Sequence, residues 1–82
     1  MSGALHTDAY KAVVAELVQL RKTAGLSQAA VAAQLFKPPS FVAKYELCER
    51  RLDVVEFFNV LNILTDDPQR EIMRFLDVVM QG

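Results

Sequence analysis

Apolar residues recur along this chain at helical spacing, and no segment shows the strict apolar–polar alternation of a half-buried strand. Val13, Leu17 and Leu20 fall three or four positions apart and define one apolar face, which predicts a first helix ending at about Ala24. Gly25 follows directly and takes the left-handed position that closes a helix. A later run, residues 54–64, is apolar except for a narrow polar stripe at every third position.

Capping residues and prolines divide the chain into five predicted helices. Ser27 and Asp53 are good N-caps, and Glu56 stands three positions after Asp53, as in a capping box. Pro39 and Pro68 each fit the first turn of a helix but not its interior. The predicted helices are residues 8–24 (capped by Thr7 or Asp8), 28–35, 39–47, 54–64 and 68–80.

The chain has 82 residues, of which 52% are hydrophobic, so we expect one packed all-α domain over residues 1–82. Residues 1–6 show no pattern, and we expect them to be disordered. No apolar run is long enough to cross a membrane, and the first residues do not resemble a signal peptide. The single cysteine fits a reducing compartment, so we expect a cytoplasmic protein.

Two short helices joined by a tight turn, between residues 28 and 47, have the spacing of a helix-turn-helix. The segments RKTAGLSQAAVAAQL, SFVAKYE and ERRLDVVEFF together resemble DNA-binding regulators of the Cro/C1-repressor type, the xenobiotic-response-element family. The resemblance covers roughly residues 13–68. It implies a five-helix, lambda-repressor-like bundle and a bacterial or phage-type regulator that binds double-stranded DNA.

The resemblance also implies roles for individual residues. Helix 39–47 would lie in the major groove, where Lys44 would pair with a guanine and Ser40 would reach a base edge. An ion pair between Arg21 and Glu46 would brace the first helix against it. Val42 and Tyr45 would face inward with Val31 and Leu35, leaving the Tyr45 hydroxyl at the rim. The DNA-facing positions are Gln28, Lys37, Pro39, Ser40, Ala43, Lys44, Arg50 and Arg51, with Gln28, Lys37, Arg50 and Arg51 on phosphates.

Each of these assignments has a plainer alternative. Gln28 is also a good helix former at an exposed helix start, Lys44 is also an ordinary solvated lysine, and paired arginines are common in surface loops. Charge is unevenly distributed: residues 37–51 carry a net +2, whereas residues 52–82 carry a net −4, within a total of −1. A locally basic segment favours contact with phosphates at that segment.

Four residues depart from the family pattern. The family has glycine where Phe36 and Cys48 stand, so each must adopt a costly positive φ or remodel its turn. Pro39 replaces a glutamine that contacts DNA, and Leu47 replaces a polar or basic residue. These departures weaken the base-reading surface more than they weaken the fold.

The last helix is too apolar for one small domain to bury completely, which predicts a homodimer. The predicted dimerisation residues are Ile72, Phe75, Leu76, Val79 and Met80. The alternative is a core helix packed on the first helix.

The expected function is therefore a sequence-specific transcriptional regulator, in the simplest case a dimeric repressor on a pseudo-palindromic operator. The alternative is a degenerate helix-turn-helix that binds a protein partner, as an antitoxin, antiactivator or antirepressor does. The sequence contains no catalytic triad, metal-ligand cluster or glycine-rich phosphate loop, so we expect no enzyme activity, no metal and no cofactor.

Overall fold

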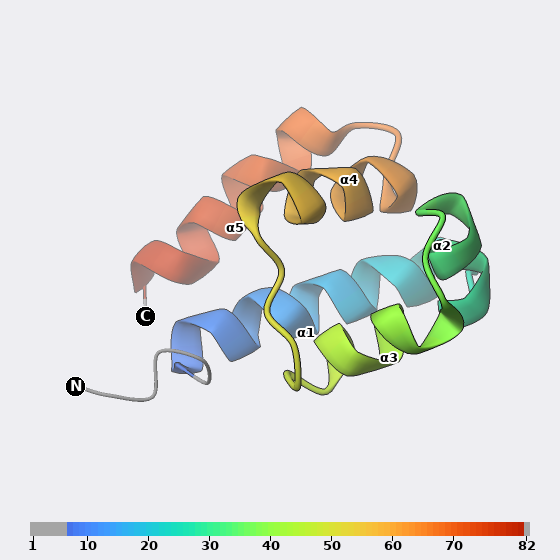
Figure 1. The fold of residues 1–82 in the computed structure, drawn as a ribbon. Helices are drawn as coiled ribbons and strands as arrows, with labels where there is room; N and C mark the ends of the chain where they lie inside the picture. The colour runs from blue at the N-terminus through green and yellow to red at the C-terminus, as the bar shows by residue number, and fades with distance from the viewer. Residues whose placement is uncertain (1–6, 82) are drawn as a thin grey trace.

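The computed structural model describes residues 7–81, which form five α-helices and no strand (Figure 1). The all-α prediction is confirmed, and the predicted helix ends differ from the observed ones by no more than one residue. Residues 1–6, for which disorder was expected, lie outside the described range. The helices are α1 (Asp8–Thr23), α2 (Gln28–Gln34), α3 (Pro39–Glu46), α4 (Val54–Leu64) and α5 (Pro68–Gln81).

The helix starts follow from local chemistry. The side chains of Thr7, Ser27 and Asp53 each accept a hydrogen bond from the backbone N–H three residues further on. The Glu56 carboxylate in turn accepts a hydrogen bond from the Asp53 N–H at 3.0 Å, which completes the predicted capping box. These bonds satisfy backbone donors that a helix leaves unpaired at its first turn.

One hydrophobic core joins all five helices. In Figure 1, α4 and α5 lie above α1, whereas α3 lies below it. Phe57 of α4 and Phe75 of α5 meet edge to face, with ring centroids 5.2 Å apart. The largest fully buried side chains are Tyr45, Leu17, Leu61, Val31, Val42 and Val60.

The inward orientation of α3 is as expected, but the prediction for the Tyr45 hydroxyl is wrong. Val31, Val42 and Tyr45 are fully buried, and Leu35 is half-buried against the core. The Tyr45 Oη is buried too, and it has no hydrogen-bond partner among residues 7–81. Burial raises the pKa of Tyr45 above its ordinary value, so the hydroxyl stays protonated.

Candidate nucleic-acid interface

Helix α3 has one face in the core and one face in solvent. Phe41, Val42 and Tyr45 fix the buried face. On the other side, Ser40 and Lys44 are exposed four residues apart, so they share one face of the helix. Pro39 is also exposed, at the first position of the helix, and Ala43 is half-buried. The positions predicted to face DNA on this helix therefore form one surface.

The turn before α3 keeps a glycine-like geometry although it contains no glycine. Phe36 has φ = 58°, in the left-handed region. Its N–H donates to the Ala33 carbonyl at 3.1 Å, and the Lys37 N–H donates to the Ala32 carbonyl at 3.0 Å. These two bonds are those of a Schellman motif, which closes α2. Of the two predicted outcomes for Phe36, the structure adopts the positive φ, at a cost of about 1–2 kcal/mol.

The end of α3 repeats this arrangement. Cys48 has φ = 60°, its N–H donates to the Tyr45 carbonyl, and the Glu49 N–H donates to the Lys44 carbonyl. The end of α1 has the same pair of bonds around Gly25, at φ = 74°. Three successive helices thus end in the same motif, and only the first has the residue that adopts it without strain.

An ion pair connects α3 to α1. Arg21 Nε donates to Glu46 Oε2 at 2.7 Å, and Arg21 Nη2 donates to Glu46 Oε1 at 3.2 Å. The predicted brace is therefore present, and both side chains are largely buried. Gln28 Nε2 also donates to Glu46 Oε1, at 2.7 Å. This role was not predicted, because nothing in the residue spacing indicates which groups share the glutamate.

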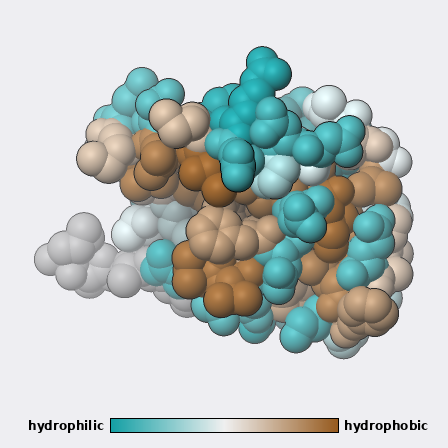
Figure 2. Space-filling model, turned by 90° about the horizontal axis from the view of Figure 1, so that it is seen from above, coloured by the Kyte–Doolittle hydropathy of each residue, from teal (hydrophilic) through white to brown (hydrophobic). Residues whose placement is uncertain are grey.

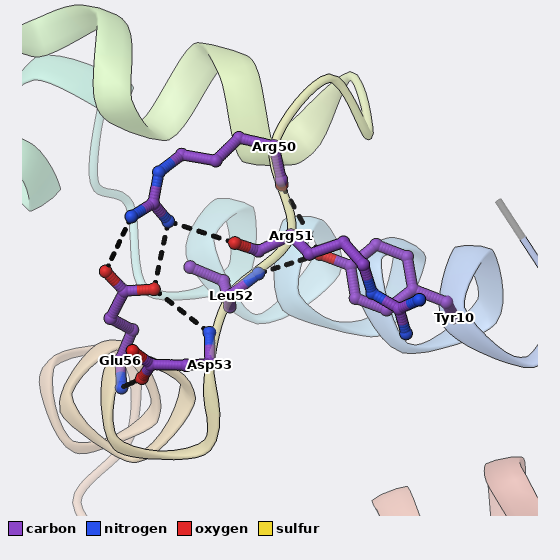
Figure 3. Close-up of polar contacts among 6 residues, drawn as sticks. All are labelled: Tyr10, Arg50, Arg51, Leu52, Asp53 and Glu56. Atoms are coloured by element: carbon purple, nitrogen blue, oxygen red, sulfur yellow. Dashed lines mark hydrogen bonds and ion pairs between the residues drawn. The ribbon is translucent and has the colours of Figure 1, made fainter. Parts of the chain in front are cut away.

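Arg50, in the loop after α3, is held by contacts within the chain (Figure 3). Its Nη1 and Nη2 donate to Glu56 Oε1 and Oε2 at 2.9 and 2.8 Å. Nη1 also donates to the Arg51 carbonyl at 3.0 Å, and the guanidinium lies 4.7 Å from the Phe41 ring centroid. Hydrogen bonds from Arg50, and then from the Asp53 backbone, lower the pKa of Glu56 to about 2. At neutral pH the Arg50 charge is therefore matched by a carboxylate 2.8 Å away.

Arg51 points to the opposite side of the loop from Arg50. Its guanidinium lies 4.4 Å from the Tyr10 ring centroid (Figure 3). The Tyr10 hydroxyl accepts a hydrogen bond from the Leu52 N–H at 3.2 Å and lies 3.5 Å from the Arg50 carbonyl oxygen. Both arginines that were expected to bind phosphate thus make contacts within the chain. Lys37 and Lys44 remain as exposed cations beside the outer face of α3.

A second surface lies between α1, α4 and α5, away from α3. It is an apolar groove of about 440 Å³, lined by residues that include Val13, Leu52, Val54, Phe58, Leu76 and Val79. Figure 2 looks down on α4 and α5 and shows hydrophobic side chains gathered on this face. The exposed large hydrophobic residues of these two helices are Val54, Val55, Phe58, Met73, Leu76, Val79 and Met80. We call these seven residues the α4–α5 patch.

The predicted dimerisation residues divide into two groups. Leu76, Val79 and Met80 are exposed and belong to the α4–α5 patch. Phe75 is buried in the core, and Ile72 is half-buried against it. α5 also lies against α1, as the alternative prediction had it. One side of the helix therefore packs in the core, as the alternative predicted, and the other side remains in solvent.

Two other features bear on the class of protein. Among residues 7–81, no group of His, Cys, Asp and Glu side chains is placed to hold a metal ion. Within the same range, no helix is long and apolar enough to span a membrane. A comparison of the chain with protein-family models finds no match, and neither does a search of the curated proteins.

Proposed function

We propose that this chain is a sequence-specific DNA-binding regulator that acts as a dimer on a pseudo-palindromic operator. The observation that carries the proposal is the outer face of α3, where Ser40 and Lys44 project together from a helix fixed in position. The Arg21–Glu46 pair ties α3 to α1. Schellman turns end both α2, which precedes it, and α3 itself. A rigid, outward-facing helix with polar side chains one turn apart suits a major groove about 12 Å wide.

Each side chain on this face has a role that follows from its chemistry. The Lys44 ammonium would donate to O6 and N7 of a guanine, and the Ser40 hydroxyl would serve either base edge or phosphate. Ala43 would offer a methyl contact, and Lys37 would neutralise a phosphate. Gln28 has a second amide N–H beside the one given to Glu46, and this N–H would serve a phosphate at the start of α2.

The two surfaces of the molecule have different chemical character, and this supports a division of tasks. Residues 37–51, around α3, carry a net +2, while residues 52–82, which contain α4 and α5, carry a net −4. DNA would therefore approach α3, and the acidic half would face away from it. The α4–α5 patch would be covered by a second copy. A twofold dimer would place two α3 helices about 34 Å apart, on successive turns of one side of the DNA. Bound to a promoter, such a dimer would repress by blocking access.

Selection of bound sequences from random duplex DNA, at two salt concentrations, tests the proposal. We expect a palindromic consensus, with affinity that falls steeply as salt rises. Lys44→Ala should relax the preference at one base pair per half-site, with a loss of roughly tenfold. Lys11→Ala, at an exposed lysine on α1, is the matched control and should leave the consensus unchanged. An unchanged consensus for Lys44→Ala would remove this residue from the reading face.

A protein-binding module is the second candidate. It is favoured by the two exposed apolar side chains at the ends of the α3 segment, Phe36 and Leu47, and by the pairing of Arg50 with Glu56. Such a protein would show no sequence enrichment even at low salt. The selection experiment therefore separates the two candidates.

A further inference from the structure

Phe36 is unfavourable for the stability of the isolated chain in two respects. It is 94% exposed, the highest value among the large hydrophobic side chains of residues 7–81, whereas Phe41 and Phe75 are buried. It also has a positive φ of 58°, a conformation that is strained for any residue with a side chain. Strained and exposed residues of this kind concentrate at functional sites, where the strain helps to present a group.

The backbone around Phe36 fixes the direction in which its side chain leaves the chain. The two Schellman hydrogen bonds hold the residue from one side. On the other side, Pro38 is the N-cap of α3 with φ = −62°, and Pro39 is the first residue of the helix. Because proline locks its own φ, the link between Phe36 and α3 has little freedom. The Cα–Cβ bond of Phe36 therefore points in a fixed direction at the N-terminal end of α3, where the proposed reading face begins.

The neighbours of Phe36 favour nucleic acid over protein as the occupant of this position. Lys37 follows it directly, and Ser40 and Lys44 continue along the exposed face of α3. These side chains suit a polyanion. A phenyl ring has no hydrogen-bonding atom. In the major groove, the apolar group that it can recognise is the 5-methyl group of thymine.

We infer that Phe36 is a specificity-determining residue that contacts the methyl group of one thymine in each half-site. This inference rests on the proposed DNA-binding function.

The experiment uses the selected operator and replaces its thymines one at a time by deoxyuridine, which lacks only the methyl group. For the unmodified protein, one replacement per half-site should weaken binding about fourfold, the effect of withdrawing one buried carbon from contact. Phe36→Gly should bind the thymine and deoxyuridine operators equally well. Cys48→Gly is the matched control, because it relieves the same backbone strain at the other end of α3 and should keep the fourfold difference.

The outcomes are distinguishable from one another. Thermal unfolding of both glycine variants checks that they fold, so weak binding by Phe36→Gly cannot be ascribed to an unfolded chain. Phe36→Leu offers a second test if the glycine variant fails to fold, and it should retain part of the discrimination. If Phe36→Gly, or Phe36→Leu in its place, keeps the full fourfold difference, the inference is overturned and the proposed function stands. If the unmodified protein binds no duplex at low salt, both are overturned.

Discussion

Arg21 and Glu46 join α1 to α3 through two hydrogen bonds, from Nε to Oε2 at 2.7 Å and from Nη2 to Oε1 at 3.2 Å. The side chains are only 13% and 8% exposed, so solvent screens the pair weakly. The same glutamate accepts from Gln28, and the same arginine donates to the Leu26 carbonyl. This group of bonds ties the start of α2 and the end of α3 to α1, and it thereby sets the orientation of the proposed reading helix.

Removing one partner of this pair should therefore be costly. We expect Arg21→Met to lower the free energy of unfolding by about 3 kcal/mol, because Glu46 keeps its charge in a poorly solvated position. Urea unfolding followed by circular dichroism measures the change. Arg74→Met is the control, since Arg74 forms exposed pairs with Glu16 and Glu71 and should cost less than about 1 kcal/mol.

A double variant separates the two explanations for such a loss. If an unpaired carboxylate is the cause, Arg21→Met combined with Glu46→Leu should recover much of the stability lost by Arg21→Met alone. Equal losses in the single and double variants would show instead that the hydrogen bonds lost with the guanidinium, such as the one to the Leu26 carbonyl, account for the cost.

The Arg50–Glu56 pair should make stability depend on pH below neutrality. Glu56 has a pKa of about 2 in the folded chain, below its ordinary value near 4.5, because Arg50 and the Asp53 N–H bond its charged form. Its contribution is therefore complete above about pH 5 and is lost as the pH falls from 4.5 toward 2. Since Arg50 is partly exposed, we expect Glu56→Gln to cost only about 1 kcal/mol at pH 7.

The informative quantity is the difference in unfolding free energy between the unmodified chain and Glu56→Gln, followed from pH 7 to pH 2.5. This difference should shrink as the solution becomes more acidic. In an Arg50→Met background, the same comparison should show a weaker pH dependence, because only the Asp53 N–H and the more distant charge of Lys37 then favour the carboxylate. A difference that stays constant across the range would contradict the ion pair.

Gly25 and Cys48 both end helices in the left-handed conformation, and substitutions at these two positions should change stability in opposite directions. Cys48→Gly should stabilise the fold by about 1 kcal/mol, because relief of the positive φ exceeds the added entropy of glycine in the unfolded chain. Gly25→Ala should destabilise by a similar amount. A Cβ added at Gly25 would meet no atom within 4 Å, so that cost is conformational rather than steric.

Thermal unfolding of the two variants, measured beside the unmodified protein, checks both signs at once. A loss of stability in Cys48→Gly would mean that the cysteine side chain makes contacts worth more than the strain. A neutral Gly25→Ala would show that the end of α1 can rearrange without penalty.

Local features predicted the fold well, because helix ends depend on neighbouring residues. Ser27, Asp53 and the two prolines at positions 39 and 68 each act within one turn, so the sequence contains their effect directly. The strain at Phe36 was one of two outcomes that the resemblance left open, because the family has glycine at this position, and the structure adopts the positive φ.

The contacts of the candidate site were less predictable, because they join segments far apart in the chain. Glu56 was predicted to be a capping-box residue, and it is one, but the same carboxylate also accepts hydrogen bonds from the Arg50 guanidinium. Gln28 likewise turns to Glu46, eighteen residues away in the sequence. A polar side chain at a surface position has several possible partners, and only the packing of the helices selects among them.

The residues of α4 that stay exposed were also hard to predict, because their exposure depends on contacts between helices. The sequence marked this helix as apolar, but which of its residues remain in solvent depends on how α5 and α1 cover it. Val54, Val55 and Phe58 stay exposed and extend the surface that was expected on α5 alone. The exposed apolar surface is therefore larger than the one predicted on α5, and Phe75, which was predicted to take part in dimerisation, is buried in the core.

The α4–α5 patch should mediate self-association. Seven hydrophobic side chains are exposed on these two helices, and clusters of exposed apolar residues mark interaction surfaces. Analytical ultracentrifugation at micromolar concentration should show a dimer of the unmodified chain. Leu76→Glu and Phe58→Glu place a charge within the patch, at side chains about half-exposed in the monomer, and each should shift the equilibrium toward monomer.

Gln19→Glu, at an exposed position on α1, adds the same charge outside the patch and should leave the dimer intact. Circular dichroism of each variant establishes that the helices are retained, so that monomer formation cannot be ascribed to unfolding. A monomer of the unmodified protein at these concentrations would contradict the dimer. A dimer that persists in both patch variants would place the interface elsewhere on the molecule, and the predicted spacing of the two α3 helices would then have to be revised.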